Sequence, residues 1–134
     1  MIKGLAHVCF RVKDLSVSED FYAHKLGLKR AFDFRKPSGE IFGIYFYAGA
    51  RNFIELFAGG PPTPAGPSSF QHFCLEVDAF HDFVGTLRER GVEVTGTKLG
   101  DDGAWQGWIT DPDGNRIELH CYTPESRQLP FLPR

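Results

Sequence analysis

Two histidines and two glutamates at matching places in the two halves of this 134-residue chain could bind a metal ion. His7 and His72 each begin a short alternating stretch, whereas Glu55 and Glu118 each lie within an Ile-Glu-Leu sequence. Carboxylates are rarely buried unless they are paired or bound to a metal. Two neutral imidazoles and two carboxylates suit a divalent cation, because the ligand charge matches that of the ion. The first hypothesis is therefore a divalent metal site.

An internal repeat explains why these residues occur twice. Asn52–Leu56 matches Asn115–Leu119 at four of five positions, with a shift of 63 residues (115 − 52). His7–Val12 and His72–Val77 resemble each other at a shift of 65 residues (72 − 7). Such self-similarity fixes the architecture, because each repeat is one structural unit. The chain is therefore expected to hold two modules of the same topology.

The first module, residues 1–58, is expected to contain a strand, a helix and three further strands. Apolar and polar residues alternate over Leu5–Lys13, as in a half-buried strand. A helix is predicted over Val17–Leu26. Asp14 or Ser16 would be its N-cap, and Gly27 would end it. The remaining strands are predicted at Lys29–Arg35, Ile41–Ala48 and Arg51–Phe57.

A stretch with four prolines and three glycines, residues 59–69, is predicted to link this module to the second one, residues 70–122. The second module repeats the order, with a helix over Phe80–Arg90 and an Asp-Pro-Asp-Gly turn at Asp111–Gly114. The tail, residues 123–134, is expected to be irregular and to lie across a neighbouring surface. The strands of this module are predicted at His72–Val77, Val92–Thr97, Gly103–Thr110 and Arg116–Cys121.

Strand alternation predicts that the two histidines and two glutamates lie on the same face of their sheets. The aliphatic neighbours of the glutamates point the other way, where the helices must pack. A helix covers only one face of a four-stranded sheet, so the face with histidine and glutamate is expected to curve around a ligand. An isolated histidine on a strand is nevertheless more often structural, and a duplicated fold can keep a binding cup without a metal.

Composition excludes several other classes of function. The net charge is −2 with no run of either sign, so neither nucleic acid nor a membrane surface is indicated as a partner. No apolar stretch approaches the roughly 20 residues needed to span a bilayer. The three cysteines, Cys9, Cys74 and Cys121, have no CxxC spacing, which is typical of a reducing, cytoplasmic setting.

These motifs together resemble the vicinal oxygen chelate superfamily, which includes glyoxalase I, thiol transferases of the fosfomycin type and extradiol dioxygenases. The resemblance extends from His7 to about Tyr122 and includes the Phe-Tyr…Leu-Gly helix end at 21–27 and the turn before Glu118. It implies an α+β fold of two tandem βαβββ modules, whose curved mixed sheets form a cup around a metal. A small-molecule substrate would chelate that metal through two adjacent oxygens.

The order histidine, glutamate, histidine, glutamate is similar to the ligand set of bacterial glyoxalase I. The resemblance implies that one Ni, Co, Zn, Mn or Fe ion is held by His7, Glu55, His72 and Glu118. It also implies a lyase or isomerase that transfers a proton next to a metal-chelated carbonyl, as in a hemithioacetal of methylglyoxal, with either glutamate as the base. Arg11 matches an arginine that binds a glutathione carboxylate, but Gly59 stands where an asparagine would contact glutathione.

Two alternatives remain open at this stage. A thiol transferase or an extradiol dioxygenase needs only two histidines and one glutamate, so Glu55 would be surplus. A metal-free, bleomycin-type binding protein would use an aromatic groove instead. Three further residues, Cys9, Trp105 and His120, are predicted to contact the substrate, and Tyr45 or Phe46 is a candidate for the pocket wall. A homodimer is expected, with each site formed within one chain or across two.

Overall fold

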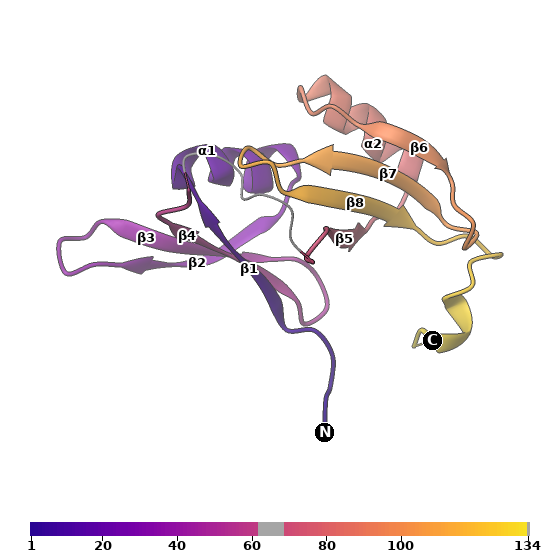
Figure 1. Cartoon of the computed structure of the whole chain (residues 1–134), viewed down its shortest axis with the longest axis horizontal. Coiled ribbons are helices and arrows are strands. Elements are labelled where there is room, and N and C mark those ends of the chain that lie inside the picture. The colour runs from indigo at the N-terminus through magenta and orange to yellow at the C-terminus, as the bar shows by residue number, and fades with distance from the viewer. Residues whose placement is uncertain (62–68, 134) are drawn as a thin grey trace. The chain divides into compact units, whose positions relative to one another are not determined.

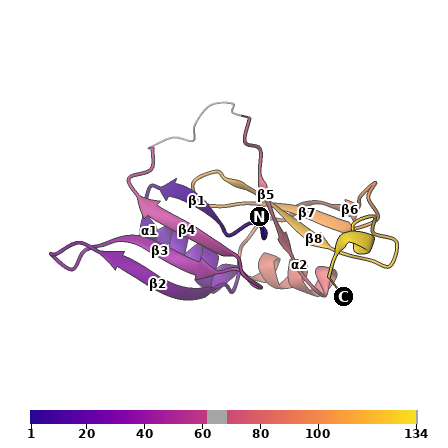
Figure 2. The ribbon, with the colours of Figure 1, turned by 90° about the horizontal axis from the view of Figure 1, so that it is seen from below.

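The computed structural model describes residues 1–61 and 69–133. The chain divides into two compact units, Met1–Pro67 and Ser68–Arg134. Each unit contains one four-stranded mixed sheet with its helical segment, as Figures 1 and 2 show from two directions. Along the chain, each unit has a strand, a helix and three more strands. The predicted α+β fold of tandem βαβββ modules is therefore confirmed.

In the first unit, the strand order is β1-β4-β3-β2, with β1 parallel to β4 and the other pairs antiparallel. One face of this sheet packs on the helical segment, where Tyr22, Phe46 and Leu56 are fully buried. Residues of opposite parity on the same strands lie on the other face, which carries His7 and Glu55. The strands are β1 (His7–Val12), β2 (Lys29–Arg35), β3 (Ile41–Tyr47) and β4 (Phe53–Ala58).

The helix of the first unit differs from the prediction of one α-helix. It consists of a short α-helix, α1 (Leu15–Glu19), followed by a π-helix over Asp20–Lys25. The Asp14 carboxylate caps the α-helix by accepting from two backbone N–H groups. Two consecutive aromatic residues of this π-helix, Phe21 and Tyr22, are both buried. Gly27 then ends the helix with a positive φ of 80°, as predicted.

The second unit repeats this topology in the order β5-β8-β7-β6, with β5 parallel to β8. The register repeats as well, because Cys9 lies opposite Glu55 and Cys74 lies opposite Glu118. The helix α2 spans Phe80–Glu89, close to the predicted range. The strands are β5 (Phe73–Glu76), β6 (Thr95–Leu99), β7 (Trp105–Thr110) and β8 (Arg116–Cys121).

Two strands of the second unit begin later than predicted. The strand predicted from Val92 begins only at Thr95, because Val92 still donates its N–H to the carbonyl of Leu87 and closes the end of α2. The strand predicted from Gly103 begins at Trp105, because Gly103 belongs to a turn and has a φ of 82°. In both cases the residues just before the strand are apolar or glycine, so the sequence pattern of a strand begins earlier than its hydrogen bonds do.

The tail was expected to be irregular but contains a 3₁₀-helix at Leu129–Phe131. The tail is hydrogen-bonded to the turn before β7. The Arg127 N–H donates to the carbonyl of Asp102 over 2.8 Å. The Thr123 hydroxyl likewise donates to the carbonyl of Gly103 over 2.6 Å. Residues 62–68 of the expected linker lie outside the described residues. None of the helices in residues 1–61 and 69–133 is long and apolar enough to cross a bilayer.

Candidate metal centre

His7 and Glu55 come together on adjacent parallel strands of the first unit. The Nε2 atom of His7 lies 3.2 Å from Oε2 of Glu55, and the two side chains are 44% and 12% exposed. Tyr45, opposite Glu55 on β3, donates its hydroxyl to the same carboxylate oxygen over 3.1 Å. Burial and this hydrogen bond raise the pKa of Tyr45 above its ordinary value. The Glu55 carboxylate is therefore held by two neighbours on the sheet face opposite the helix.

The second unit has an equivalent pair, His72 and Glu118. The Nε2 atom of His72 lies 3.1 Å from Oε2 of Glu118, and the side chains are 27% and 16% exposed. The imidazole stands edge-on to Trp108, with ring centroids 4.7 Å apart. The Nδ1 atom of His72 is buried and has no hydrogen-bond partner among the described residues. An unpaired buried polar atom of this kind costs about 1–3 kcal/mol.

The chemistry and spacing of each pair fit a divalent cation. Neighbouring ligand atoms on one octahedral ion, each bonded at about 2.1 Å, lie about 3 Å apart. The nitrogen–oxygen distances of 3.2 Å for His7–Glu55 and 3.1 Å for His72–Glu118 match this separation. Each unit therefore offers one imidazole and one carboxylate that can occupy two adjacent positions on an ion.

His120 extends the polar cluster of the second unit. Its Nδ1 atom lies 3.5 Å from Oε1 of Glu118, and its Nε2 atom lies 3.8 Å from Oδ2 of Asp102. Hydrogen bonds from the Gln128 side chain and the Ala104 backbone hold the pKa of Asp102 below its ordinary value. The sequence predicts that His120 contacts the substrate, and the structure places it on the same sheet face as Glu118.

The sequence of residues 4–119 matches the profile of the Glyoxalase/Bleomycin resistance protein/Dioxygenase superfamily. The chain belongs to this superfamily. Among curated proteins, the metallothiol transferase FosB of Staphylococcus saprophyticus is 27% identical over 130 residues, covering 95% of this chain and 82% of FosB. This match spans both units.

Solved structures of the superfamily share the fold. TnmS3, an antibiotic-binding protein from a Streptomyces species, is 28% identical with a TM-score of 0.73, covering 91% of this chain and 98% of TnmS3. A lactoylglutathione lyase from Agrobacterium tumefaciens is 20% identical with a TM-score of 0.67, covering 90% of this chain and 94% of the lyase. At that identity, the likeness to the lyase shows the fold alone.

Of the other predicted substrate contacts, one lies on the same sheet face as the histidines and another does not. Arg11 lies on the same strand face as His7, and its Nη1 donates to the carbonyl of Ala58 over 3.3 Å. Trp105 was predicted to contact the substrate, but it lies on the helix side of the sheet. There its ring stacks on Phe80 at 6.0 Å. Trp108, three residues later, is the tryptophan that lies beside the histidine–glutamate pair.

The two cysteines beside the glutamates are poor nucleophiles. Burial, followed by the charge of Glu55, raises the pKa of the Cys9 thiol above its ordinary value. Burial and the charge of Glu118 raise the pKa of the Cys74 thiol to about 12. Since the thiolate is the reactive form, both thiols should react more slowly at neutral pH than an ordinary cysteine, although both side chains are solvent-exposed.

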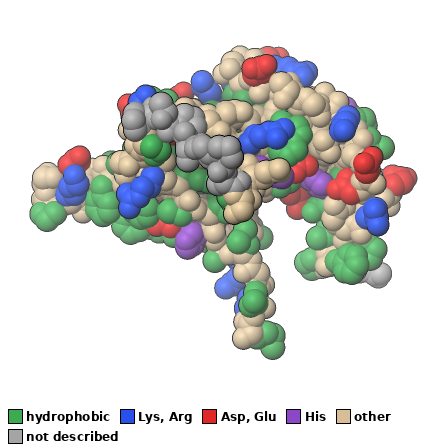
Figure 3. Space-filling view, in the orientation of Figure 1, with side chains coloured by type: hydrophobic (Ala, Val, Ile, Leu, Met, Phe, Trp, Pro, Cys, Tyr) green, Lys and Arg blue, Asp and Glu red, His purple; other side chains and the backbone are tan. Residues whose placement is uncertain are grey.

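An aromatic surface adjoins Glu55 on the first sheet. Phe32 stacks on Tyr45 with centroids 4.5 Å apart, and Phe34 stacks on Phe57 at 5.7 Å. Gly43 makes this possible, because a Cβ there would lie 2.7 Å from the ring of Phe57. Hydrophobic side chains gather over β2 and β3 in the space-filling view (Figure 3). The sequence offered Tyr45 or Phe46 as a pocket wall; Tyr45 lies on this surface, whereas Phe46 is buried in the core.

Proposed function

We propose that this protein is a metal-dependent lyase or isomerase that moves a proton on the carbon next to a carbonyl, as in a hemithioacetal of methylglyoxal. The observation that supports the proposal is the presence of a histidine–glutamate pair in each unit, at 3.2 and 3.1 Å. In the proposal, His7, Glu55, His72 and Glu118 together form one site. A site with a second glutamate has a carboxylate for each direction of proton transfer.

Each residue has a distinct part in the proposed reaction. A divalent cation held by the four residues would polarise the substrate carbonyl. One of the two glutamates, Glu55 or Glu118, takes the proton from the neighbouring carbon, and one of them returns it to the adjacent carbon. Tyr45 keeps its hydrogen bond to Glu55 and fixes the direction of that carboxylate. Arg11 binds a carboxylate of the substrate, and the aromatic surface beside Glu55 receives its apolar part.

Proton exchange tests this proposal directly. The purified protein would first be analysed for metals and then loaded with Ni²⁺, Co²⁺, Mn²⁺, Fe²⁺ or Zn²⁺. Methylglyoxal adducts of several thiols would be added in D₂O, and deuterium at the reacting carbon would be followed by NMR. We expect exchange that is lost in Glu118→Gln but kept in Glu40→Gln, a surface glutamate paired with Lys36. Absence of exchange with every adduct and metal would refute the proposal.

A second candidate function is metal-dependent thiol transfer, which the 27% identity to a metallothiol transferase favours. Such a site needs only His7, His72 and Glu118. Glu55→Gln distinguishes the two candidates, because an amide can bind a metal but cannot accept the proton. Retained turnover in this variant, with thiol and electrophile as substrates, would favour transfer. Loss of proton exchange with retained metal would favour the isomerase.

A metal-free binding protein is the third possibility, and the 28% identity to antibiotic-binding TnmS3 is the observation that favours it. It predicts no bound metal after purification from metal-rich medium. It also predicts that aromatic ligands quench Trp108 fluorescence equally with and without a chelator. Metal-dependent quenching would count against it.

We further propose that the protein is a homodimer whose sites are shared between chains. Mixing variants tests this arrangement without any structural assumption. His7→Ala and His72→Ala should each be inactive alone. Subunit exchange between them should restore one intact site per mixed dimer, so about a quarter of the wild-type activity is expected if all pairings are equally frequent. No recovery, despite proven exchange, would show that each site is formed within one chain.

A further inference from the structure

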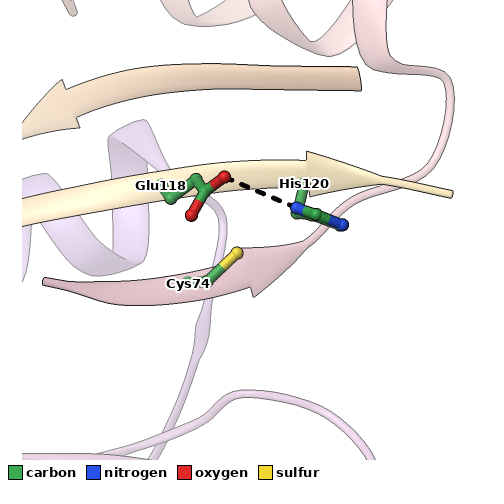
Figure 4. A group of neighbouring side chains, drawn as sticks. All are labelled: Cys74, Glu118 and His120. Atoms are coloured by element: carbon green, nitrogen blue, oxygen red, sulfur yellow. Dashed lines mark ion pairs between the residues drawn. The ribbon is translucent and has the colours of Figure 1, made fainter. Parts of the chain in front are cut away.

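The second unit brings three different metal-binding groups together on one sheet face. Cys74 projects from β5, and Glu118 and His120 project from the adjacent strand β8, as Figure 4 shows. One ligand atom from each residue lies within 4.8 Å of the other two. Thiolate, carboxylate and imidazole are the three ligand types that zinc takes in proteins.

The geometry of this cluster is near that of a tetrahedral site. Ligand atoms bonded to zinc at 2.0–2.3 Å lie about 3.3–3.5 Å from one another. The separation between Glu118 Oε1 and His120 Nδ1 is already 3.5 Å. The sulfur of Cys74 lies within 4.8 Å of the other two ligand atoms, and rotation about its only side-chain torsion can bring it closer. Because the strand backbones fix all three residues, little ordering is needed to bind an ion.

The internal repeat provides a comparison site that lacks one ligand. Cys9 lies opposite Glu55 in the first unit, as Cys74 lies opposite Glu118. The residue equivalent to His120, at the same shift of 63 (120 − 57), is Phe57. The first unit therefore has the thiol and the carboxylate but no imidazole at the position of His120.

The surrounding charges also differ between the two places. Beside Cys9, the positive charge of Arg11 acts against that of Glu55. Around Cys74, the negative charges of Glu118, Asp102 and Glu76 add to one another. The charges around Cys74 therefore favour a thiolate-bound cation more than the charges around Cys9 do.

We propose that Cys74, Glu118 and His120 bind a thiophilic divalent cation, such as Zn²⁺, within the second unit. Formation of the metal–sulfur bond releases the thiol proton to solvent, and a water molecule completes the tetrahedron. Two of its three ligands, Cys74 and His120, are not ligands of the four-residue site of the proposed function, and it needs neither a substrate nor the first unit. The two sites share Glu118, so a thiophilic ion bound here competes with a metal bound there.

Cobalt spectroscopy of the full chain tests the proposal, because thiolate-to-cobalt charge transfer absorbs in the near ultraviolet. The four-residue site has no sulfur and gives no such band. We expect a band at one equivalent of Co²⁺ that disappears on addition of Zn²⁺. It should be lost in Cys74→Ser, kept in Cys9→Ser, and need about tenfold more Co²⁺ in His120→Phe, which copies the first unit. No band, or a band lost only in Cys9→Ser, would overturn the proposal.

Alkylation of the wild-type protein gives a second test. It uses no variant, so misfolding of a variant cannot affect the result. Zn²⁺ should slow the reaction of Cys74 with a maleimide by tenfold or more, as counted by peptide mass spectrometry, whereas Cys9 should react at its metal-free rate. Equal protection of both cysteines, or of neither, would contradict a site at Cys74. Neither experiment uses a substrate, so failure of the isomerase proposal leaves this result unaffected.

Discussion

The hydrogen bond from Tyr45 to Glu55 makes a testable difference between the two glutamates. Tyr45→Phe removes one hydroxyl and leaves the ring, so the stacking on Phe32 is retained. Glu118 lies opposite Trp108 instead of a tyrosine. The substitution therefore perturbs only one of the two carboxylates that are proposed to bind the metal.

The expected loss of metal affinity in Tyr45→Phe follows from the strength of the hydrogen bond that is removed. A hydrogen bond to a charged group contributes about 1.5–3 kcal/mol, and Tyr45 lies at a partly exposed position, which favours the lower value. The hydroxyl orients Glu55 before a metal binds, so losing this preorganisation costs up to about 1.5 kcal/mol of binding free energy, or about tenfold in the binding constant. The Tyr45→Phe protein should therefore bind its metal about tenfold more weakly. Its rate of proton exchange at metal saturation should fall by a similar factor if Glu55 is the base.

Tyr47 supplies a matched control on the same strand and the same face. Its hydroxyl donates to the backbone carbonyl of Ala50 over 3.2 Å and does not reach a carboxylate. Metal affinity would be measured by competition with a chromophoric chelator in wild type, Tyr45→Phe and Tyr47→Phe. Urea unfolding of the metal-free proteins would separate effects on stability from effects on binding.

Three results would refute this reasoning. Equal metal affinity of wild type and Tyr45→Phe would show that the hydroxyl does not position Glu55 for binding. Equal weakening in Tyr45→Phe and Tyr47→Phe would show that the strand, and not the carboxylate, is perturbed. A fall in affinity that matches the fall in unfolding free energy of the metal-free protein would have the same meaning.

Three further predictions concern stability. Gly103→Ala should destabilise the protein by about 1–3 kcal/mol in urea unfolding, because Gly103 has a φ of 82° and a Cβ would lie 2.5 Å from the Glu125 carbonyl oxygen. Leu119→Ala should cost about 2–5 kcal/mol in the same assay, since Leu119 is fully buried. Asp33 has a pKa lowered first by its hydrogen bond from Arg35, so this stabilisation is present above the unfolded pKa and lost as the pH falls through the folded one. The difference in unfolding free energy between wild type and Asp33→Asn should therefore shrink on acidification below about pH 4; a constant difference would contradict the pairing.

The sheet faces could be predicted from the sequence because strand alternation is strict. A residue two positions from a buried aliphatic on the same strand must share its face, and a residue one position away must not. Glu118, between the fully buried Ile117 and Leu119, therefore had to lie on the face away from the helix. The internal repeat leads to the same conclusion for Glu55, so the sequence places each glutamate on the sheet face that also carries a histidine.

The helix of the first unit could not be predicted with the same reliability. Apolar spacing over a short segment does not distinguish an α-helix from a π-helix, because both bury one side. The choice between the two helix types depends on how the segment packs on the sheet, where Phe21 and Tyr22 are both buried. Alternation on β7 likewise puts Trp105 and Trp108 on opposite faces but does not fix which one shares the face of Glu118, and the prediction of Trp105 was wrong. The packing of Phe80 on Trp105 decides that.

The sequence also does not predict hydrogen bonds between side chains that are far apart in the chain. Gln128 donates to Asp102 over 2.6 Å, and Asp102 in turn lies beside His120. Nothing in the local sequence of the tail predicts this, because the contact depends on a turn 26 residues earlier. The tail therefore fixes an acidic group near the cluster of the second unit. The internal repeat thus gives the chain two similar histidine–glutamate pairs, and the C-terminal tail adds polar contacts around the pair of the second unit.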